Sequence, residues 1–372
     1  MSQTAAKQVK QAKPRLSDSL RDETLMKWLR DMQLIREFEL RTAQAYQQAK
    51  IGGFCHIYIG QEASAVGTIG SVNHDDPIVL AYRDHGHALA RGMDPAVCMA
   101  EMFGKAAGCA KGKGGSMHMF DKPNWLFGGH GIVGAQTPLG AGLAFGAKYE
   151  WEVLGKALDG SPPKKKVCLC YLGDGALNQG ALHEAMNLAS LFGLPVIYIV
   201  ENNGYSMGTA IDRGTTMAND LSRKAAAYGM DYVEFDGMDI RNIYDKFKPL
   251  ADECREKQKP AFVNLKTYRY QGHSMSDPQK YRTKDEVEQW KDRDSIAMLA
   301  HHLMTERECL SEEDWKALQK ELRGIVREAI KVAEAAPEPD VQAELYADVF
   351  ANPQVNLSPS GEYVHGAKNP LL

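Results

Sequence analysis

The stretch that decides the fold reads Val-Cys-Leu-Cys-Tyr-Leu at 167–172, Gly-Asp-Gly at 173–175 and, after a helical run, Pro-Val-Ile-Tyr-Ile-Val-Glu-Asn-Asn-Gly-Tyr at 195–205. Both apolar runs are short, partly β-branched or aromatic, and bounded by Gly, Pro, Asp or Asn, which is typical of buried parallel strands. From Ala176 to about Leu191 apolar residues recur at helical spacing. A strand, a helix and a strand of these lengths predict one βαβ unit.

Polar residues follow each predicted strand, so the parallel arrangement brings them to one edge of the sheet, where ligands bind in open α/β folds. Asp174 offers a carboxylate and Asn203 a carbonyl oxygen, which are suitable donors for Mg²⁺. We expect Gly175 and Ala176 to open the helix, whose free N–H groups attract phosphate. The combination predicts a diphosphate bound beside a metal ion. Either tripeptide taken alone is more readily interpreted as a plain turn or loop.

The spacing of Gly-Asp-Gly and Asn-Asn resembles the thiamin diphosphate motif of the transketolase and 2-oxo acid dehydrogenase group. The surroundings are similar to one branch, the alpha subunits of the thiamin-dependent decarboxylase components of 2-oxo acid dehydrogenase complexes. The matching segments are Gly-Phe-Cys-His (53–56), Gly-Gln-Glu-Ala (60–63), Tyr-Arg-Asp-His-Gly (82–86), Lys-Gly-Lys-Gly-Gly-Ser-Met-His-Met (111–119), Gly-Ile-Val-Gly-Ala-Gln (131–136), Gly-Asp-Gly-Ala (173–176), Glu-Asn-Asn (201–203) and Tyr-Arg-Tyr-Gln-Gly-His-Ser-Met-Ser-Asp-Pro (268–278).

The resemblance implies an α/β fold of three layers, the thiamin diphosphate-binding fold, with a mainly parallel sheet flanked by helices. We expect a disordered tail at 1–16, the binding domain with helical additions at 17–336, and a C-terminal extension at 337–372. A mitochondrial presequence is the alternative interpretation of the tail. Apolar patterns predict further helices at 22–48, 61–72 and 238–257 and further strands at 77–82, 232–236 and 261–267.

The resemblance also implies thiamin diphosphate and Mg²⁺ as cofactors. Tyr82 and Arg83 would contact the diphosphate, for which the forked guanidinium is well suited, although an isolated Arg reads as a surface ion-pair residue. Main-chain groups of Gly131 and Val133 would meet the aminopyrimidine ring. The expected cofactor-binding residues are Tyr82, Arg83, Gly131, Val133, Asp174, Gly175, Ala176, Asn203 and His273, and the expected metal ligands are Asp174, Asn203 and the main-chain oxygen of Tyr205.

His56 and His273 are the expected catalytic residues. Taken alone, a His after a glycine pair is more often structural, and a His in a loop is more often solvated. The resemblance reverses both interpretations. The family places the residue that matches His56 at the active-site channel near the reacting thiazolium, and the residue that matches His273 in contact with the diphosphate beside that channel. A neutral imidazole can donate or accept a proton near pH 7.

The charged and apolar fractions are those of an ordinary soluble protein. The net charge of −4 gives no reason to expect nucleic acid or a membrane surface as a partner. No apolar run reaches the length of a membrane span. The seven cysteines are scattered, without a Cys-x-x-Cys pair, which favours a reducing compartment. We expect the cytoplasm of a bacterium, with the mitochondrial matrix or a plastid as alternatives.

The resemblance implies partner proteins. In the family, the Glu that activates the aminopyrimidine ring comes from a beta subunit, and this chain contains no second α/β half to provide it. We therefore expect an α2β2 heterotetramer that transfers an acyl group to the lipoyl domain of a dihydrolipoyl acetyltransferase. Pyruvate is the expected substrate. Acetoin, a branched-chain 2-oxo acid, or a non-catalytic scaffold role are the alternatives.

Two further segments bear on function. Residues 104–118 are rich in Gly and Lys, and one interpretation is a phosphate-cradling loop. We prefer a close-packed loop near the site or near a subunit contact, because the P-loop pattern is absent. Ser274 matches a regulatory phosphoserine of eukaryotic relatives. The second such serine is missing and Ala210 stands at the third position, so we expect no control by a kinase.

Overall fold

A six-stranded sheet with the strand order β2-β1-β3-β4-β8-β7 forms the centre of the computed structural model, which describes residues 15–157, 160–345 and 347–348. Every pairing in this sheet is parallel. The strands are β1 (Ile78–Ala81), β2 (Leu126–His130), β3 (Cys168–Gly173), β4 (Val196–Asn202), β7 (Asp231–Asp236) and β8 (Ala261–Lys266), and a separate hairpin joins β5 (Tyr205–Ser206) to β6 (Thr209–Ala210). The predicted parallel α/β fold is confirmed.

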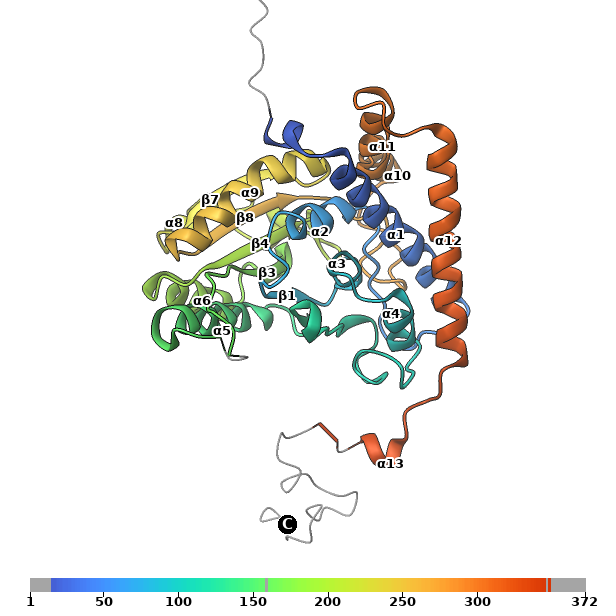
Figure 1. The fold of residues 1–372 in the computed structure, drawn as a ribbon, viewed down its shortest axis with the longest axis horizontal. Helices are drawn as coiled ribbons and strands as arrows, with labels where there is room; N and C mark the ends of the chain where they lie inside the picture. Colours follow the sequence, from blue (N-terminus) through green and yellow to red (C-terminus); the bar gives the residue numbers. More distant parts are fainter. Residues whose placement is uncertain (1–14, 158–159, 346, 349–372) are drawn as a thin grey trace, which may run out of the picture.

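Helices cover both faces of the sheet and make the outer two layers (Figure 1). The helices are α1 (Asp22–Gln47), α2 (Glu62–Ile69), α3 (His85–Arg91), α4 (Pro95–Met102), α5 (Gln136–Tyr149), α6 (Gly180–Leu191), α7 (Ile211–Gly214), α8 (Ser222–Ala226), α9 (Ile240–Lys257), α10 (Lys284–Lys291), α11 (Ser295–Thr305), α12 (Glu312–Ala335) and α13 (Val341–Glu344). Shorter turns are η1 (Leu16–Ser19), η2 (Gly115–Met117), η3 (Lys122–Asn124), η4 (Glu150–Leu154) and η5 (Asp174–Ala176). The long helix α12 runs along α1 and α4.

The central strands bury both of their faces, which explains their continuous apolar sequence. In β3, Leu169 and Tyr171 join the core under α1, α2 and α9, whereas Cys168 and Cys170 join the core under α5 and α6. Strand β4 alternates in the same way. The two cysteines are therefore packing residues, and all seven cysteines are free thiols.

The register of β3 and β4 positions the site. Gly173 pairs with Glu201 at the end of the ladder, so Asp174 and Asn203 leave adjacent strands at the same edge. Helix α6 provides the crossover between these strands, and α9 provides the crossover from β7 to β8. The strands at 77–82, 232–236 and 261–267 and the helices at 22–48, 61–72 and 238–257 are confirmed to within a few residues.

One local prediction is wrong, and one strand was not predicted. Helix α6 begins at Gly180 and not at Gly175 or Ala176, which lie in the turn η5. Strand β2 was not expected, because its sequence Leu-Phe-Gly-Gly-His is too rich in glycine to favour a strand by itself. Its pairing with β1, the neighbouring strand, compensates for this weak local preference.

Both ends of the chain lie largely outside the described residues, namely 1–14 of the predicted tail and 349–372 of the predicted extension. Arg15 and Leu16 are described, and Nε of Arg15 donates to Asp245 in α9 at 2.7 Å. Within the extension, α13 lies beside the segment 104–118, where Lys111 and Lys113 form ion pairs with Glu344.

Candidate active site

One cavity of about 950 Å³ lies at the carboxyl edge of the sheet, between the ends of β1, β3 and β4 and the loop that follows β8. All eleven residues that the sequence singles out line it, although they come from distant parts of the chain. They are His56, Tyr82, Arg83, Gly131, Val133, Asp174, Gly175, Ala176, Asn203, Tyr205 and His273. The sequence pattern therefore predicted a group of residues that the fold brings together.

The carboxylate of Asp174 is only partly hydrogen-bonded. Its side chain is buried, and its Oδ2 atom has no hydrogen-bond partner among the described residues. Burial raises the pKa of this carboxyl to about 6, although the positive charge of Arg269 opposes the rise. A buried carboxylate oxygen without a partner is costly for the folded protein. The atom is thus positioned to bind a cation or a hydrogen-bond donor from outside the chain.

The Oδ1 atom of Asn203 and the main-chain oxygen of Tyr205 accept only long hydrogen bonds from the described residues. The Oδ1 atom of Asn203 accepts the main-chain N–H of Tyr205 at 3.3 Å, and its amide donates to Gln61 at 3.3 Å. The main-chain oxygen of Tyr205 accepts from Nη2 of Arg269 at 3.3 Å. Both oxygens have a second lone pair for a further ligand.

The turn after β3 differs from the expected helix start. Gly175 and Ala176 belong to the single 3₁₀ turn η5, so the argument from the N-terminus of a long helix is wrong. A Cβ atom at Gly175 would lie 2.6 Å from Oγ of Ser206, so a larger residue would displace the adjoining hairpin. Lys224, buried in α8, donates to the main-chain oxygen of Leu177 at 3.0 Å and fixes the end of this turn.

Arg83 forms hydrogen bonds with two segments of the cavity wall. Its guanidinium is buried and donates to the main-chain oxygen of Ile57 at 2.7 Å and of His273 at 2.8 Å. These bonds connect the segment before α2 to the loop after β8. Besides lining the cavity, Arg83 therefore sets the relative position of the segments that carry His56 and His273.

The rings of His56, Tyr82 and His273 form an aromatic cluster. The ring centroid of His56 lies 4.6 Å from that of Tyr82 and 5.1 Å from that of His273. Burial and the nearby Arg83 charge lower the pKa of His56 to about 2 and that of His273 to about 4. Both imidazoles are accordingly neutral at physiological pH. As neutral rings they are suited to donate or accept hydrogen bonds rather than to provide fixed positive charge.

Gly131 and Val133 follow strand β2 and form an apolar rim. The neighbouring Ile132 is 76% exposed and Val133 is 40% exposed. A Cβ atom at Gly131 would lie 3.2 Å from Nε2 of His118, a third histidine that lines the cavity. Such exposed aliphatic side chains around a polar interior are suited to contact the ring of a ligand or another protein.

The sequence analysis missed several functional residues of the cavity. Arg269 is buried, and its Nη1 atom has no hydrogen-bond partner within the described part of the chain. Burial together with the Arg83 charge lowers the pKa of Arg269 to about 10. Gln61, Glu201 and His118 also line the cavity. All four lie within the segments that carry the resemblance. The sequence signal that could have identified these four residues is the family motif itself, because a role was assigned to only some of the residues in the matching segments.

The segment 104–118 is a close-packed loop and not a phosphate cradle. Both oxygens of the fully buried Glu101 fill its centre: one accepts the N–H groups of Ala110 and Gly112 at 2.7 and 2.9 Å, and the other accepts those of Gly114 and Gly115 at 2.7 and 3.1 Å. The loop therefore encloses a carboxylate of the chain itself. Lys111 and Lys113 point away from this centre, toward α13.

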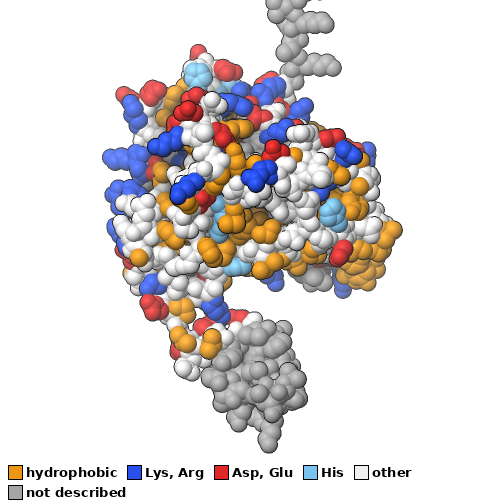
Figure 2. Space-filling view, turned by 180° about the vertical axis from the view of Figure 1, so that it is seen from behind, with side chains coloured by type: hydrophobic (Ala, Val, Ile, Leu, Met, Phe, Trp, Pro, Cys, Tyr) orange, Lys and Arg blue, Asp and Glu red, His pale blue; other side chains and the backbone are white. Residues whose placement is uncertain are grey.

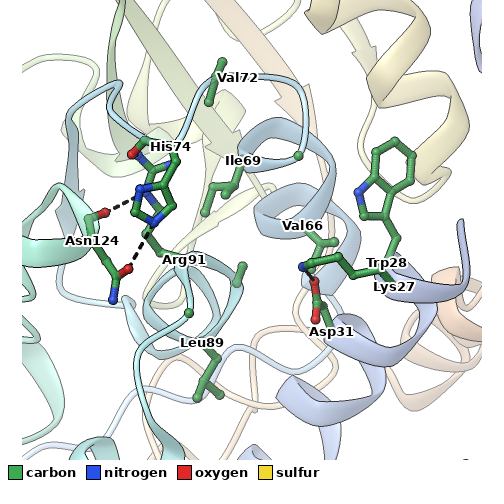
Figure 3. A pocket seen from close by; sticks show the side chains of 13 residues that line it. Lys27, Trp28, Asp31, Val66, Ile69, Val72, His74, Leu89, Arg91 and Asn124 are labelled. Atoms are coloured by element: carbon green, nitrogen blue, oxygen red, sulfur yellow. Dashed lines mark hydrogen bonds and ion pairs between the residues drawn. The ribbon is translucent and has the colours of Figure 1, made fainter. Parts of the chain in front are cut away.

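A second cavity of about 390 Å³ contains none of the expected residues (Figure 3). It lies near the amino ends of β1 and β2, opposite the first cavity. The polar groups around it bond to one another, since His74 bonds to Asn124 at 3.0 Å and Lys27 pairs with Asp31. This self-contained arrangement makes it a weaker candidate for the active site.

No helix in the described part is long and apolar enough to span a bilayer. Nor do the described residues contain a group of three or more His, Cys, Asp and Glu side chains that could bind a metal ion. A metal at the first cavity would depend on one carboxylate and neutral oxygens.

Comparison with known proteins identifies the family of this chain. The family described as dehydrogenase E1 component matches residues 30–342. The pyruvate dehydrogenase E1 component subunit alpha of Rickettsia felis is 46% identical over 330 residues, which cover 88% of this chain and 96% of that protein. The subunit of the same name from Rhizobium meliloti is 45% identical over 326 residues, which cover 87% and 89%, and the chloroplastic alpha-3 subunit of Oryza sativa is 39% identical over 334 residues, which cover 90% and 77%. This chain belongs to the family of dehydrogenase E1 components.

Proposed function

We propose that this chain is the alpha subunit of a pyruvate dehydrogenase (acetyl-transferring) that uses thiamin diphosphate and Mg²⁺ and is active with a beta subunit. The observation that carries the proposal is the position of the unpaired oxygen of Asp174 in a cavity lined by all the expected residues. The names of the similar proteins, each a pyruvate dehydrogenase E1 component subunit alpha, support pyruvate as the substrate.

The residues fit a bound Mg²⁺ ion. Asp174 supplies a buried carboxylate oxygen that lacks a partner, and Asn203 and the main chain of Tyr205 supply neutral oxygens with spare lone pairs. Mg²⁺ commonly takes one or two carboxylates and completes its shell with phosphate oxygens and water. We assign these three residues as the metal ligands, with Arg83, Arg269 and Tyr82 beside the diphosphate.

The chemistry divides between the cofactor and the chain. Thiamin diphosphate, when bound, supplies a carbanion and an electron sink for the decarboxylation of a 2-oxo acid. The cavity supplies orientation and partial exclusion of water. The neutral rings of His56 and His273 orient the substrate and exchange protons with its oxygen atoms.

An exposed apolar surface supports a partner subunit. Seen from behind, hydrophobic side chains gather in the middle of the face and at its lower right edge (Figure 2). Helices α5 and α6 and the turn η4 carry many exposed examples: Leu139, Phe145, Tyr149, Trp151, Val153, Leu154, Leu188, Leu191 and Phe192. Patches of this kind mark protein–protein contacts. We infer that a beta subunit covers part of this surface in an α2β2 heterotetramer.

The acyl acceptor and the location are part of the same proposal. We infer that the acetyl group passes to the lipoyl domain of a dihydrolipoyl acetyltransferase. The word component in the names of the similar proteins supports membership in a larger complex. The bacterial origin of relatives in Rickettsia and Rhizobium supports a bacterial cytoplasm as the location.

Coexpression of this chain with the beta subunit encoded in the same genome tests the proposal. The purified complex should decarboxylate pyruvate only with thiamin diphosphate and Mg²⁺, and should acetylate an isolated lipoyl domain. Higher kcat/KM for acetoin or for a branched-chain 2-oxo acid would reassign the substrate. Full activity of this chain alone would contradict the need for a partner, and no activity on the whole panel would contradict the enzymatic role.

A further inference from the structure

Three buried side chains behind His56 form a continuous chain of hydrogen bonds that the proposed chemistry does not use. Glu39 in α1 and His85 in α3 are fully buried, and Ser116 in η2 is 3% exposed. The Nδ1 atom of His85 lies 3.0 Å from Oε2 of Glu39, and its Nε2 atom lies 2.9 Å from Oγ of Ser116. A carboxylate, an imidazole and a hydroxyl in this order resemble a nucleophilic triad.

The arrangement does not operate as a nucleophile. None of the three residues lines the cavity, so a substrate has no access to Oγ of Ser116. That oxygen already accepts the main-chain N–H of His56 at 3.2 Å. An activated serine instead needs a free path to an electrophile. The cluster therefore acts on the protein itself.

The hydrogen bonds determine the charges of the cluster. Nδ1 of His85 faces a carboxylate, and Nε2 lies 2.8 Å from the main-chain oxygen of Ser116, which can only accept. Both ring nitrogens consequently carry a proton, and His85 is a cation paired with Glu39. Burial alone would lower the pKa of His85, but the Glu39 carboxylate outweighs it and raises the pKa to about 9.

The cluster contacts the segment that carries His56 at two main-chain positions. Ser116 accepts the N–H of His56, and Oε1 of Glu39 accepts the N–H of Tyr58 at 2.7 Å. Because both bonds are buried, losing either one leaves an unsatisfied N–H group in the interior. The backbone on both sides of residue 57 is thereby fixed to α1, α3 and η2.

We propose that Glu39, His85 and Ser116 are positioning residues that fix the backbone at His56 and so hold its ring at its place beside Tyr82 and His273. This inference rests on the proposed role of His56 in substrate orientation. Orientation errors of about 1 Å cost roughly a hundredfold in rate, so rigid support matters here. A buried ion pair contributes little net stability but is strongly disruptive when only one partner is removed.

The test compares variants of the complete alpha–beta complex. Glu39→Ala and Ser116→Ala should lower kcat at least about tenfold, while the KM for pyruvate and the Kd for thiamin diphosphate change less than about threefold. Glu39→Gln should recover most of the activity, because the amide can accept from Tyr58 and donate to a neutral His85. Glu37→Ala is the matched control, since Glu37 is also buried in α1 but bonds to Gln33 and Arg323.

Amide hydrogen exchange measured by mass spectrometry gives a readout that does not depend on activity. Exchange in the peptide 54–59 should be about tenfold faster in Ser116→Ala and Glu39→Ala, a factor that corresponds to about 1.4 kcal/mol, and unchanged in Glu37→Ala. Unchanged exchange and unchanged kcat in Ser116→Ala would overturn the proposal, even if Glu39→Ala fails to fold. A complex inactive on every 2-oxo acid would instead contradict the proposed function, while the exchange data would still decide the positioning role.

Discussion

Two walls of the cavity differ in how completely their hydrogen bonds are satisfied. At the ends of β3 and β4, Asp174 has an unpaired buried oxygen and Asn203 has only bonds of 3.3 Å. On the opposite wall, the backbone at His56 is bonded to Ser116, and Ser116 to the buried pair of His85 and Glu39. We call the first region the metal edge and the second the histidine wall.

The comparison separates residues that bind a ligand from residues that support the site. Folded proteins satisfy nearly all their buried polar groups, so an exception such as the metal edge indicates a position reserved for something outside the chain. In the histidine wall, the side chains of Glu39, His85 and Ser116 and the backbone that they bond are satisfied internally and behave as scaffold. The exception there is Nδ1 of the His56 ring, which has no hydrogen-bond partner among the described residues. The predictions below test this division, beginning with the largest expected effect.

Replacement of Asp174 should have the largest effect. Asp174→Ala removes the only carboxylate proposed to bind Mg²⁺, so we expect a loss of activity of more than about a thousandfold, corresponding to about 4 kcal/mol of transition-state stabilisation. Steady-state decarboxylation of pyruvate by the complex, at saturating Mg²⁺ and cofactor, measures it. Asp212→Ala, an exposed residue in α7, is the control. Turnover within tenfold of the wild type would refute the metal assignment.

Replacement of Asp174 should lower activity but raise the stability of the ligand-free protein. Its pKa is raised to about 6 in the folded chain, so the folded state binds its proton more tightly than the unfolded state. The stability contributed by this group is therefore lost as pH rises from about 4 through 6. Without ligands, Asp174→Asn should be more stable than the wild type by up to about 3 kcal/mol at pH 7 and by much less at pH 4. Denaturant unfolding of the cofactor-free complex at both pH values tests this, and a destabilised Asn variant at pH 7 would contradict it.

Replacement of Glu101, which supports the loop 104–118, should instead lower the stability of the protein. Glu101→Gln places an NH₂ group against main-chain N–H donors in the loop 104–118, which we expect to cost about 2 to 3 kcal/mol of stability. Thermal and denaturant unfolding measure the loss, and the exposed Glu313→Gln should change stability by less than about 0.5 kcal/mol. Equal stability of the two variants would show that the carboxylate does not organise the loop.

The outer face of the same loop should contribute least. Lys111 and Lys113 pair with Glu344 and Asp348 at the surface, and exposed ion pairs contribute little because water and salt screen them. The double variant Lys111→Ala/Lys113→Ala should shift the melting temperature by no more than about 2 °C and leave kcat unchanged. A shift in melting temperature as large as that of Glu101→Gln would mean that the surface ion pairs, and not the buried Glu101 carboxylate, stabilise the loop.

The sequence predicted the metal edge better than the histidine wall. Gly-Asp-Gly and Asn-Asn lie at the ends of consecutive strands, so the βαβ unit alone brings Asp174 and Asn203 together. Glu39 and Glu101 lie inside helices, where an acidic residue reads as solvent-facing. Both carboxylates accept hydrogen bonds from loops that lie later in the sequence, and a local sequence pattern cannot predict such contacts. The start of α6 and strand β2 were missed because glycine permits several backbone conformations.

The most direct test of the account is the location of the metal in the complex. Mn²⁺ substituted for Mg²⁺, together with thiamin diphosphate, can be located by anomalous diffraction from crystals of the alpha–beta complex. The account predicts one peak in each alpha subunit, about 2.1 Å from an oxygen of Asp174 and from Oδ1 of Asn203, with the diphosphate beside Arg83. A peak elsewhere, or a bound cofactor with Asp174 still unpaired, would contradict it.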